Sequence, residues 1–514
     1  MKEKLIYFKR FRYTKKPTVV LLNEEFINRM EKLKAIKEQG INPYPHYTDH
    51  VITPIKEIVK WPRVGAIVST AGRIIATRRH GKIAFVDLLD DGYKIQLVLR
   101  VDNIGDKFEW FLKYLDEGDF IEATGRIFYT KKGELSIDVS EFKLLSKSLR
   151  ELPGKYGRGM KDPEVRYRNR HMDILLNPRV RWIFETRFKI IQEMRRFLWS
   201  KGFVEVDTPI LQPVYGGAAA RPFTTKIWAI DEEWYLRISP ELYLKRYIIA
   251  GFNKVFEIGK QFRNEDIDVR HNPEFTMMEI YEAYADYNDM MKLTEELIHH
   301  IARSVLGKTT VKFLVVDSEI VTINLEPPYR RLTMKEAFKE YVNIDVDSLS
   351  DNEIKEMLSQ HNIILKGGYV RGLAIAKLFD KLVEKHLVQP TFIIDHPKET
   401  TPLCKLHRKD PSLIERFELY IGGLEIANAY TELNDPILQR KFFKEEEERL
   451  RKGDEEAHPY DWEFIEALEY GMPPTGGVGI GVDRVVMIMV GTNSLKEVIP
   501  FPILKRKIKV EQEG

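Results

Sequence analysis

One stretch decides the fold, because it combines a strand pattern with charged side chains. Residues 255–287 read VFEIGKQFRNEDIDVRHNPEFTMMEIYEAYADY. A period of two predicts a strand over 254–265 with Arg263 and Glu265 on one face, and a second over 274–283 with Phe275, Met277, Glu279 and Tyr281 on one face. If the strands pair as a hairpin, these faces share one surface. The charged and phenolic side chains on this surface are costly to bury without partners. The guanidinium of an arginine fits a carboxylate or a phosphate. A salt-bridged, exposed hairpin is the alternative.

A glycine-rich segment near the C-terminal end also carries a charged pair. Residues 476–490 read GGVGIGVDRVVMIMV, in which four glycines precede Asp483 and Arg484. Glycine lets the backbone approach a ligand closely, and Arg484 is able to hold a phosphate. A tight packing turn between a strand and a helix is the alternative interpretation.

An amphipathic helix opens the large C-terminal part. Its apolar positions recur at three- and four-residue steps and are Ile183, Phe184, Phe188, Ile191, Met194 and Leu198. Gly202 ends this helix, and the sequence FVEVDTP that follows is typical of a strand. Further strand-like segments are 234–240, 417–433 and 476–482, and helical stretches are 286–306, 333–341 and 351–362. The acidic run within 441–456 indicates an exposed helix with a solvated face.

The N-terminal part has a different pattern. Residues 64–145 hold short alternating segments such as IAFVDLLD, YKIQLVLR, FIEATGRIFY and ELSIDVSEF, and the turn signals DDG and KKG separate them. This spacing is typical of a small β-barrel. A helix before it, within 26–63, is expected to end at Gly40.

Composition excludes several classes of protein. One cysteine, Cys404, excludes intramolecular disulfides and cysteine zinc clusters, which fits a cytoplasmic location. No apolar run approaches the roughly 20 residues of a membrane span. The net charge of +3 excludes a uniformly basic nucleic-acid coat. Basic residues nevertheless dominate in 1–63 and 146–182, and acidic residues dominate in 183–514.

Taken in order, the three motifs resemble the signature motifs of class II aminoacyl-tRNA synthetases. The segments GGAAARPF, YLRISPELYLKR, GGLEIANAYTELND and RMEKLKAIKEQGINPYP, together with 255–287, are similar to those of class II lysyl-tRNA synthetases. The resemblance runs from about residue 29 to about residue 505.

This resemblance implies an α+β protein with an N-terminal β-barrel (an OB-fold) and a large catalytic domain whose antiparallel sheet is flanked by helices. The expected parts are a basic arm (1–25), a helical lead-in (26–63), an anticodon-binding OB-fold (64–145), a basic linker (146–182) and a catalytic domain (183–514). The family reaction joins L-lysine to tRNA(Lys) through a lysyl-adenylate formed from ATP. A homodimer is also implied, because the first motif forms the subunit interface in this family.

The resemblance also assigns roles to individual residues. Arg263 and Arg484 would be catalytic, and Arg263, Glu265, His271, Phe275 and Arg484 would bind ATP. Lysine would contact Gly217, Glu241, Glu279, Tyr281, Asn428 and Glu432, while Glu418 and Glu425 would bind Mg²⁺. Anticodon contacts would come from Arg73, Arg78, Phe85, Gln96 and Glu134. Phe85 as an ordinary core residue of the barrel is the alternative.

One set of assignments conflicts with regular strand geometry. Asn428, Tyr430 and Glu432 share a strand face, whereas Glu425 is out of phase with them. We therefore predict a bulge or twist near residues 426–427.

Three other functions stay open. An aspartyl- or asparaginyl-type ligase shares the architecture, but carboxylates at Glu279 and Glu432 would repel an aspartate side chain. An enzyme that lysylates elongation factor P would resemble only the catalytic part. A non-catalytic tRNA-binding protein would not be expected to keep all of Arg263, Glu265, Glu418, Glu425 and Arg484.

Overall fold

The computed structural model describes residues 24–153, 160–315 and 319–505. The chain divides into two compact units, Met1–Arg181 and Trp182–Gly514, and each is described by itself. The expected basic arm lies outside the described residues except for its last two. Among the described helices, none is both long and apolar enough to cross a membrane.

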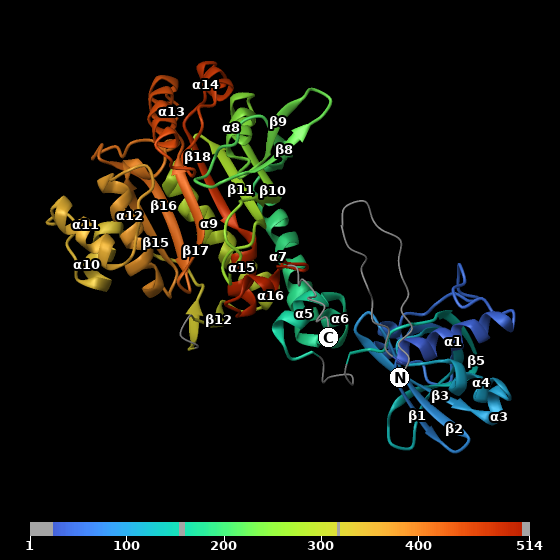
Figure 1. Ribbon diagram of the computed structural model, residues 1–514. Coiled ribbons are helices and arrows are strands. Elements are labelled where there is room, and N and C mark those ends of the chain that lie inside the picture. Colours follow the sequence, from blue (N-terminus) through green and yellow to red (C-terminus); the bar gives the residue numbers. More distant parts are fainter. Residues whose placement is uncertain (1–23, 154–159, 316–318, 506–514) are drawn as a thin grey trace, which may run out of the picture. The chain divides into compact units, whose positions relative to one another are not determined.

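The first unit contains a closed five-stranded barrel, as the resemblance predicts (Figure 1). Its strands follow the spatial order β1-β2-β3-β5-β4. They are β1 (Ile67–His80), β2 (Ile83–Asp90), β3 (Tyr93–Arg100), β4 (Phe120–Tyr129) and β5 (Leu135–Ser146), and α3 (Val101–Ile104) and α4 (Lys107–Tyr114) follow β3. The DDG signal forms the β2–β3 turn, where Asp91 and Gly92 both take a positive φ.

The predicted helical lead-in is confirmed. It consists of α1 (Glu24–Glu38) and α2 (Ile55–Lys60), and Gly40 has a φ of 75° just after α1. A buried ion-pair network holds α1 to the barrel, because Asp116 pairs with Lys32 and with Lys147 at 2.6 Å each. The segment expected to be a linker includes two short helices, α5 (Pro163–Arg168) and α6 (Arg170–Leu176).

The second unit is built on an eight-stranded sheet with the order β14-β15-β16-β17-β18-β11-β10-β6. Its pairs are antiparallel, except for parallel pairs at the two edges, β14 with β15 and β10 with β6. The sheet strands are β6 (Val204–Glu205), β10 (Lys254–Phe262), β11 (Glu274–Ala283), β14 (Arg330–Thr333), β15 (Thr391–Pro397), β16 (Leu413–Ile421), β17 (Leu424–Thr431) and β18 (Thr475–Gly481). Smaller sheets comprise β7 (Leu211–Gln212), β8 (Phe223–Ile227) and β9 (Glu232–Leu236), and β12 (Thr310–Leu314) with β13 (Ile320–Asn324).

Helices flank this sheet (Figure 1). They are α7 (Pro178–Ser200), α8 (Glu241–Ile249), α9 (Tyr287–Ile301), α10 (Met334–Val342), α11 (Asp351–Gln360), α12 (Arg371–Leu382), α13 (Pro436–Arg451), α14 (Trp462–Glu469), α15 (Val482–Val490) and α16 (Leu495–Val498). Three further short helices are the π-helix η1 (Ala302–Leu306) and the 3-10 helices η2 (Glu384–His386) and η3 (Lys398–Thr400). The largest core joins α7, α9 and α15 to the sheet, and a second core packs α8, α13 and α14 against β10 and β11.

Two local expectations were wrong. The segment 417–433 is not one strand but part of a hairpin, because Gly422 and Gly423 take φ values of 66° and 69° and reverse the chain. The acidic run of α13 is not fully solvated. Glu446 is buried, pairs with Arg449 at 2.6 Å and accepts a hydrogen bond from the His458 backbone N–H at 3.2 Å.

The three motifs meet in one buried cluster beneath the sheet. Arg187 of α7 pairs with Asp483 of α15 and donates to the Thr276 hydroxyl of β11 at 3.1 Å. The Thr276 backbone N–H donates to Asp483 Oδ2 at 2.8 Å. The first helix, the hairpin and the glycine-rich strand are therefore fixed to one another by charge as well as by apolar packing.

Candidate active site

The predicted hairpin is present and forms one wall of a cavity. β10 and β11 pair antiparallel, with Gln261 opposite Phe275. The first strand ends earlier than expected, at Phe262, so Arg263 and Glu265 lie in the loop that follows. After Phe262 the Arg263 backbone N–H still donates to the Pro273 carbonyl at 2.9 Å, but the Asn264 backbone N–H donates to the Arg221 carbonyl outside the sheet at 2.8 Å, which ends the strand pairing. The Arg263 guanidinium lies over the Phe275 ring, 5.1 Å from its centroid.

The predicted bulge is confirmed at Ile426. Leu419 pairs with Ala427 and Tyr420 pairs with Glu425, which leaves Ile426 as the extra residue of β17. The bulge removes the conflict in phase, because Glu425 and Asn428 now line the same cavity.

Three buried carboxyl groups line the cavity. Glu279 accepts hydrogen bonds from the Ser239 hydroxyl at 2.8 Å and from the Tyr281 hydroxyl at 3.0 Å. Glu241 is 4% exposed and Glu432 is fully buried, with no hydrogen-bond partner for its Oε1 atom. A side chain at Gly477 would overlap Glu432 Oε1 and the Tyr281 ring, so glycine is needed there.

A buried lysine joins two of these carboxyl groups. The Lys245 ammonium lies 2.6 Å from Glu241 Oε1 and also pairs with Glu432 Oε2. Burial disfavours the ammonium form, but the charges of Glu241 and Glu432 outweigh that effect and raise the pKa of Lys245.

Burial governs the charge state of the carboxyl groups. It raises the pKa of Glu279 to about 7, and the neighbouring charge of Glu241 adds to the shift. Burial also raises the pKa of Glu241 and of Glu432, against the lowering influence of Lys245. A cationic ligand would favour the ionised form of all three groups.

Gly217 faces this set at a point where a side chain does not fit. Its φ is 84°, and an added Cβ would lie 2.8 Å from Ser239 Oγ and 2.9 Å from the Glu241 Cβ. The backbone of Gly217 therefore closely approaches the Glu241 end of the cavity.

A second pair of carboxylates lies on β16 and β17, and each already has a cationic partner. Glu418 pairs with Arg416 and accepts a hydrogen bond from the Tyr420 hydroxyl at 2.7 Å. Arg484 Nη1 donates to the Glu425 carbonyl at 2.7 Å and lies 3.3 Å from Glu425 Oε2.

Glu265 and His271 lie at the exposed side of the cavity. Both side chains are exposed, and His271 Nδ1 lies 2.8 Å from Asp268 Oδ2. Glu265, His271 and Arg484 line the same cavity. Because Glu265 and His271 are exposed, they provide polar groups where the cavity meets solvent.

One cavity of about 790 Å³ brings together all the site residues expected in the second unit. They are Gly217, Glu241, Arg263, Glu265, His271, Phe275, Glu279, Tyr281, Glu418, Glu425, Asn428, Glu432 and Arg484. The cavity is strongly charged, and the carboxyl groups of Glu241, Glu279 and Glu432 lie buried in its wall. It is large enough for a nucleotide together with an amino acid.

Four of the five residues expected to contact the anticodon gather on the outside of the barrel. Arg78 pairs with Asp87 at 2.8 Å and lies 3.5 Å from Gln96 Oε1, and the charge of Glu134 also acts on Arg78. Phe85 lies opposite Arg78 in the β1–β2 pairing. It is half-buried and does not belong to the apolar core of the barrel, which argues against the core interpretation.

Arg73 has a different environment. Its guanidinium lies 4.2 Å from the centroid of the Phe120 ring, and Nη1 donates to the Gly118 carbonyl at 3.2 Å. These contacts anchor Arg73 to the β4 side of the barrel and do not join it to the Arg78 cluster.

Several cavity residues were missed by sequence reasoning. Lys245, Arg416, Asp380, His396 and Arg449 all line or close the cavity. Lys245 lies in YLRISPELYLKR, where a basic residue on a helix is usually exposed. Its position four residues after Glu241 was the one available signal, because that spacing places both residues on one helix face.

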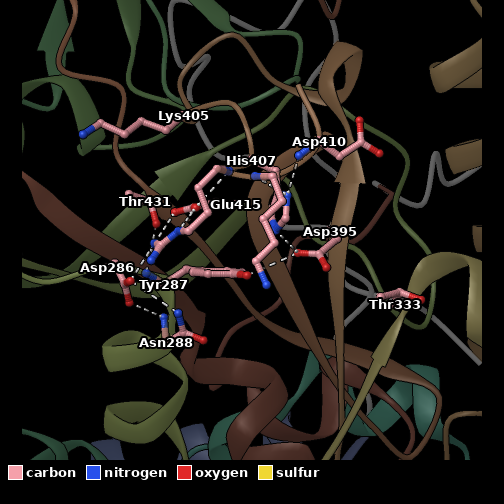
Figure 2. A network of polar contacts seen from close by, with 12 residues as sticks. Asp286, Tyr287, Asn288, Thr333, Asp395, Lys405, His407, Asp410, Glu415 and Thr431 are labelled. Carbon is pink, nitrogen blue, oxygen red and sulfur yellow. Dashed lines mark hydrogen bonds and ion pairs between the residues drawn. The ribbon is translucent and has the colours of Figure 1, made fainter. Parts of the chain in front are cut away.

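A second polar network lies outside the cavity and is structural (Figure 2). Arg408 pairs with Glu415 of β16 and with Asp286 at the start of α9. The His407 ring accepts a hydrogen bond from the Asp410 backbone N–H at 3.1 Å. These contacts fix the loop before β16 to the N-terminal end of α9.

Comparison with known proteins agrees with this geometry. Residues 162–505 match the family described as tRNA synthetases class II (D, K and N), and residues 68–145 match the OB-fold nucleic acid binding domain. A protein of Saccharolobus solfataricus named lysine–tRNA ligase is 53% identical over 494 residues, which is 94% of this chain and 98% of the relative. Proteins with the same name from Sulfolobus acidocaldarius and Methanoculleus marisnigri are 51% and 47% identical, over 93% of this chain and 96% and 95% of their own lengths.

An antiparallel sheet carrying an arginine-lined, carboxylate-ended cavity, joined to an OB-fold, defines a class II aminoacyl-tRNA synthetase. Within that class, the chain belongs to the lysine–tRNA ligase family.

Proposed function

We propose that the chain attaches L-lysine to tRNA(Lys) with ATP, through a lysyl-adenylate, and releases AMP and pyrophosphate. The observation that carries this proposal is the buried carboxyl set Glu241, Glu279 and Glu432, in the wall of a cavity that also presents Arg263 over Phe275. Three buried carboxyl groups suit a ligand with more than one ammonium group.

In the first step the lysine carboxylate attacks the α-phosphorus of ATP and pyrophosphate leaves. Such a step needs alignment and charge compensation rather than a protein nucleophile. Arg263 bridges the substrate carboxylate and the α-phosphate. Phe275 stacks on adenine and Glu265 faces its amino group, while His271 and Arg484 hold the β- and γ-phosphates.

The lysine subsite follows the charges of the substrate. Glu241 and the backbone of Gly217 meet the α-ammonium, and Asn428 lies near the carboxylate. Glu279, Tyr281 and Glu432 meet the ε-ammonium. An uncharged side chain would leave these buried carboxylates without a counter-charge, so it is rejected.

Glu418 and Glu425 fit a magnesium site in their donor chemistry, because both offer carboxylate oxygens on neighbouring strands. Within the described part of the chain, no group of three or more acidic, histidine or cysteine residues is suited to a metal. An ion held here would therefore take its other ligands from ATP oxygens and water, which is the usual arrangement for Mg²⁺. When bound, it would neutralise phosphate charge.

In the second step a hydroxyl of the terminal tRNA ribose attacks the activated lysyl carbonyl, and AMP leaves. The barrel holds the anticodon, where Phe85 stacks on a base and Arg78, Gln96 and Glu134 contact base edges. Arg73 contacts the same RNA from the β4 side of the barrel, where its guanidinium lies over Phe120. The basic segments that precede and follow the barrel in the sequence suit the tRNA backbone.

We also propose a cytoplasmic homodimer. The large aromatic side chains Phe188 and Trp199 on α7 are 52% and 53% exposed, which leaves apolar surface for a second copy to cover.

Pyrophosphate exchange with each of the twenty amino acids tests the proposal. We expect lysine alone to stimulate exchange. Stimulation by aspartate or asparagine would support the related ligases, and no exchange would support a non-catalytic binding protein.

A further inference from the structure

Lys245 places a resident positive charge beside the proposed lysine subsite. Its side chain is fully buried in α8, and its ammonium contacts carboxylates from two separate elements. Glu241 belongs to the same helix, whereas Glu432 follows β17. A buried cation bound to two carboxylates fixes the side chains of both.

The tyrosine, cysteine and histidine groups beside this set are uncharged near neutral pH. Burial raises the pKa of Tyr281, Tyr430 and Cys404, and burial lowers the pKa of His458 to about 4. Arg416 and Arg449 also line the cavity, but Arg416 pairs with Glu418, and Arg449 pairs with Glu446 and Asp454. The charge balance of the subsite therefore rests on Glu241, Glu279, Glu432 and Lys245, with the charge of Arg263 acting on Glu279.

The count of charges matches the proposed substrate. When a cationic ligand favours the ionised form of all three carboxyl groups, these groups and the Lys245 ammonium leave two negative charges in the subsite. Free lysine brings an α-ammonium and an ε-ammonium, while its carboxylate faces Arg263. Without Lys245, three carboxylates would lie close together in a buried site, and mutual repulsion would favour protonation of at least one of them.

We propose that Lys245 is a positioning residue that holds Glu241 and Glu432 ionised and in place, and thereby makes the subsite selective for an amino acid with a cationic side chain. This inference rests on the proposed function, because it concerns the specificity of the same subsite. It adds a residue that does not itself touch the substrate.

The test compares lysine with L-norleucine, which has the same carbon chain but no ε-ammonium. Pyrophosphate exchange gives kcat/KM for both amino acids in wild type and in Lys245→Met. We expect the lysine-to-norleucine ratio to fall at least about tenfold at pH 7, since a neutral carboxyl pair no longer rejects an uncharged chain. The ratio should recover partly at pH 9, where the carboxyl groups ionise again.

Controls separate this effect from a loss of structure. Lys254→Met removes a lysine that pairs with Glu282 at 2.6 Å on the hairpin but does not line the cavity, and its ratio should equal that of wild type. If the Lys245→Met protein does not fold, the same lysine-to-norleucine ratio is measured for Lys245→Gln. Glutamine keeps a hydrogen-bond donor at this position but removes the positive charge.

The possible results distinguish the two proposals. An unchanged ratio in a folded Lys245 variant, with wild type active on lysine, overturns the role of Lys245 alone. An equal loss of kcat/KM for both amino acids, without recovery at pH 9, also overturns it. A wild type that does not activate lysine overturns the proposed function itself.

Discussion

Gly477→Ala adds one methyl group at the wall of the proposed lysine subsite. Gly477 lies on the central strand β18, between Tyr281 and Tyr430. The new Cβ would overlap Glu432 Oε1 and would lie 2.5 Å from Tyr281 Cε1 and 2.8 Å from Cδ1. Both neighbours are buried, so relief requires Glu432 to move toward the space that lysine would occupy.

The size of the effect follows from the overlap. Overpacking of this kind costs about 1–3 kcal/mol. Expressed as lysine affinity, this corresponds to a rise in KM for lysine of roughly 5- to 150-fold, at about 1.4 kcal/mol per factor of ten. The backbone of Gly477 does not require a positive φ, so the strand itself tolerates alanine.

Steady-state pyrophosphate exchange measures KM for lysine and for ATP separately. We expect the lysine value to rise and the ATP value to stay within about twofold, a difference smaller than 0.5 kcal/mol. Gly481→Ala is the matched control on the same strand, because its Cβ meets nothing closer than Arg484 Cδ at 3.6 Å. A folded Gly477→Ala protein with the wild-type KM for lysine would refute the placement of the subsite.

Three further predictions concern separate parts of the account. Burial raises the pKa of Glu279 to about 7, so protons compete with lysine for this carboxylate at lower pH. KM for lysine, measured by pyrophosphate exchange, should therefore rise about tenfold from pH 8 to pH 6. A KM for lysine that does not change with pH would show that protonation of Glu279 does not compete with lysine binding. Phe85→Ala should raise KM for tRNA in aminoacylation by roughly 5- to 150-fold and leave pyrophosphate exchange intact, because one lost base stack costs about 1–3 kcal/mol. An equal loss of activity in both assays would contradict separate anticodon and catalytic sites. Glu425→Gln should raise the Mg²⁺ concentration for half-maximal exchange at least about tenfold, and an unchanged magnesium titration would remove Glu425 from the metal site.

Much of the site follows from local patterns in the sequence. The paired strands around Arg263 and Phe275 have the period of two that a hairpin requires. The bulge at Ile426 follows from the conflict between Glu425 and Asn428, which a regular strand cannot place in one cavity. Both features depend on residues close together in the chain.

Features that depend on distant contacts are not predictable in this way. The strand before Arg263 ends early because Asn264 bonds to a carbonyl at Arg221, and no local signal specifies that partner. Glu446 is buried because it meets the backbone of His458.

Lys245 shows the same limit at the site itself. Helical spacing pairs Lys245 with Glu241, but its second partner, Glu432, is distant from it in the sequence. Whether a lysine is exposed or becomes a buried counter-charge is decided by that tertiary contact.

Transfer of lysine to tRNA tests the central claim most directly. The purified chain is incubated with ATP, Mg²⁺, labelled lysine and a tRNA(Lys) transcript, and the label on tRNA is measured by acid precipitation. The account predicts lysine esterified to the terminal ribose, released by mild alkali and absent when Arg263 is replaced by alanine. Label that stays on protein, or a transcript that is charged with aspartate instead of lysine, would contradict it.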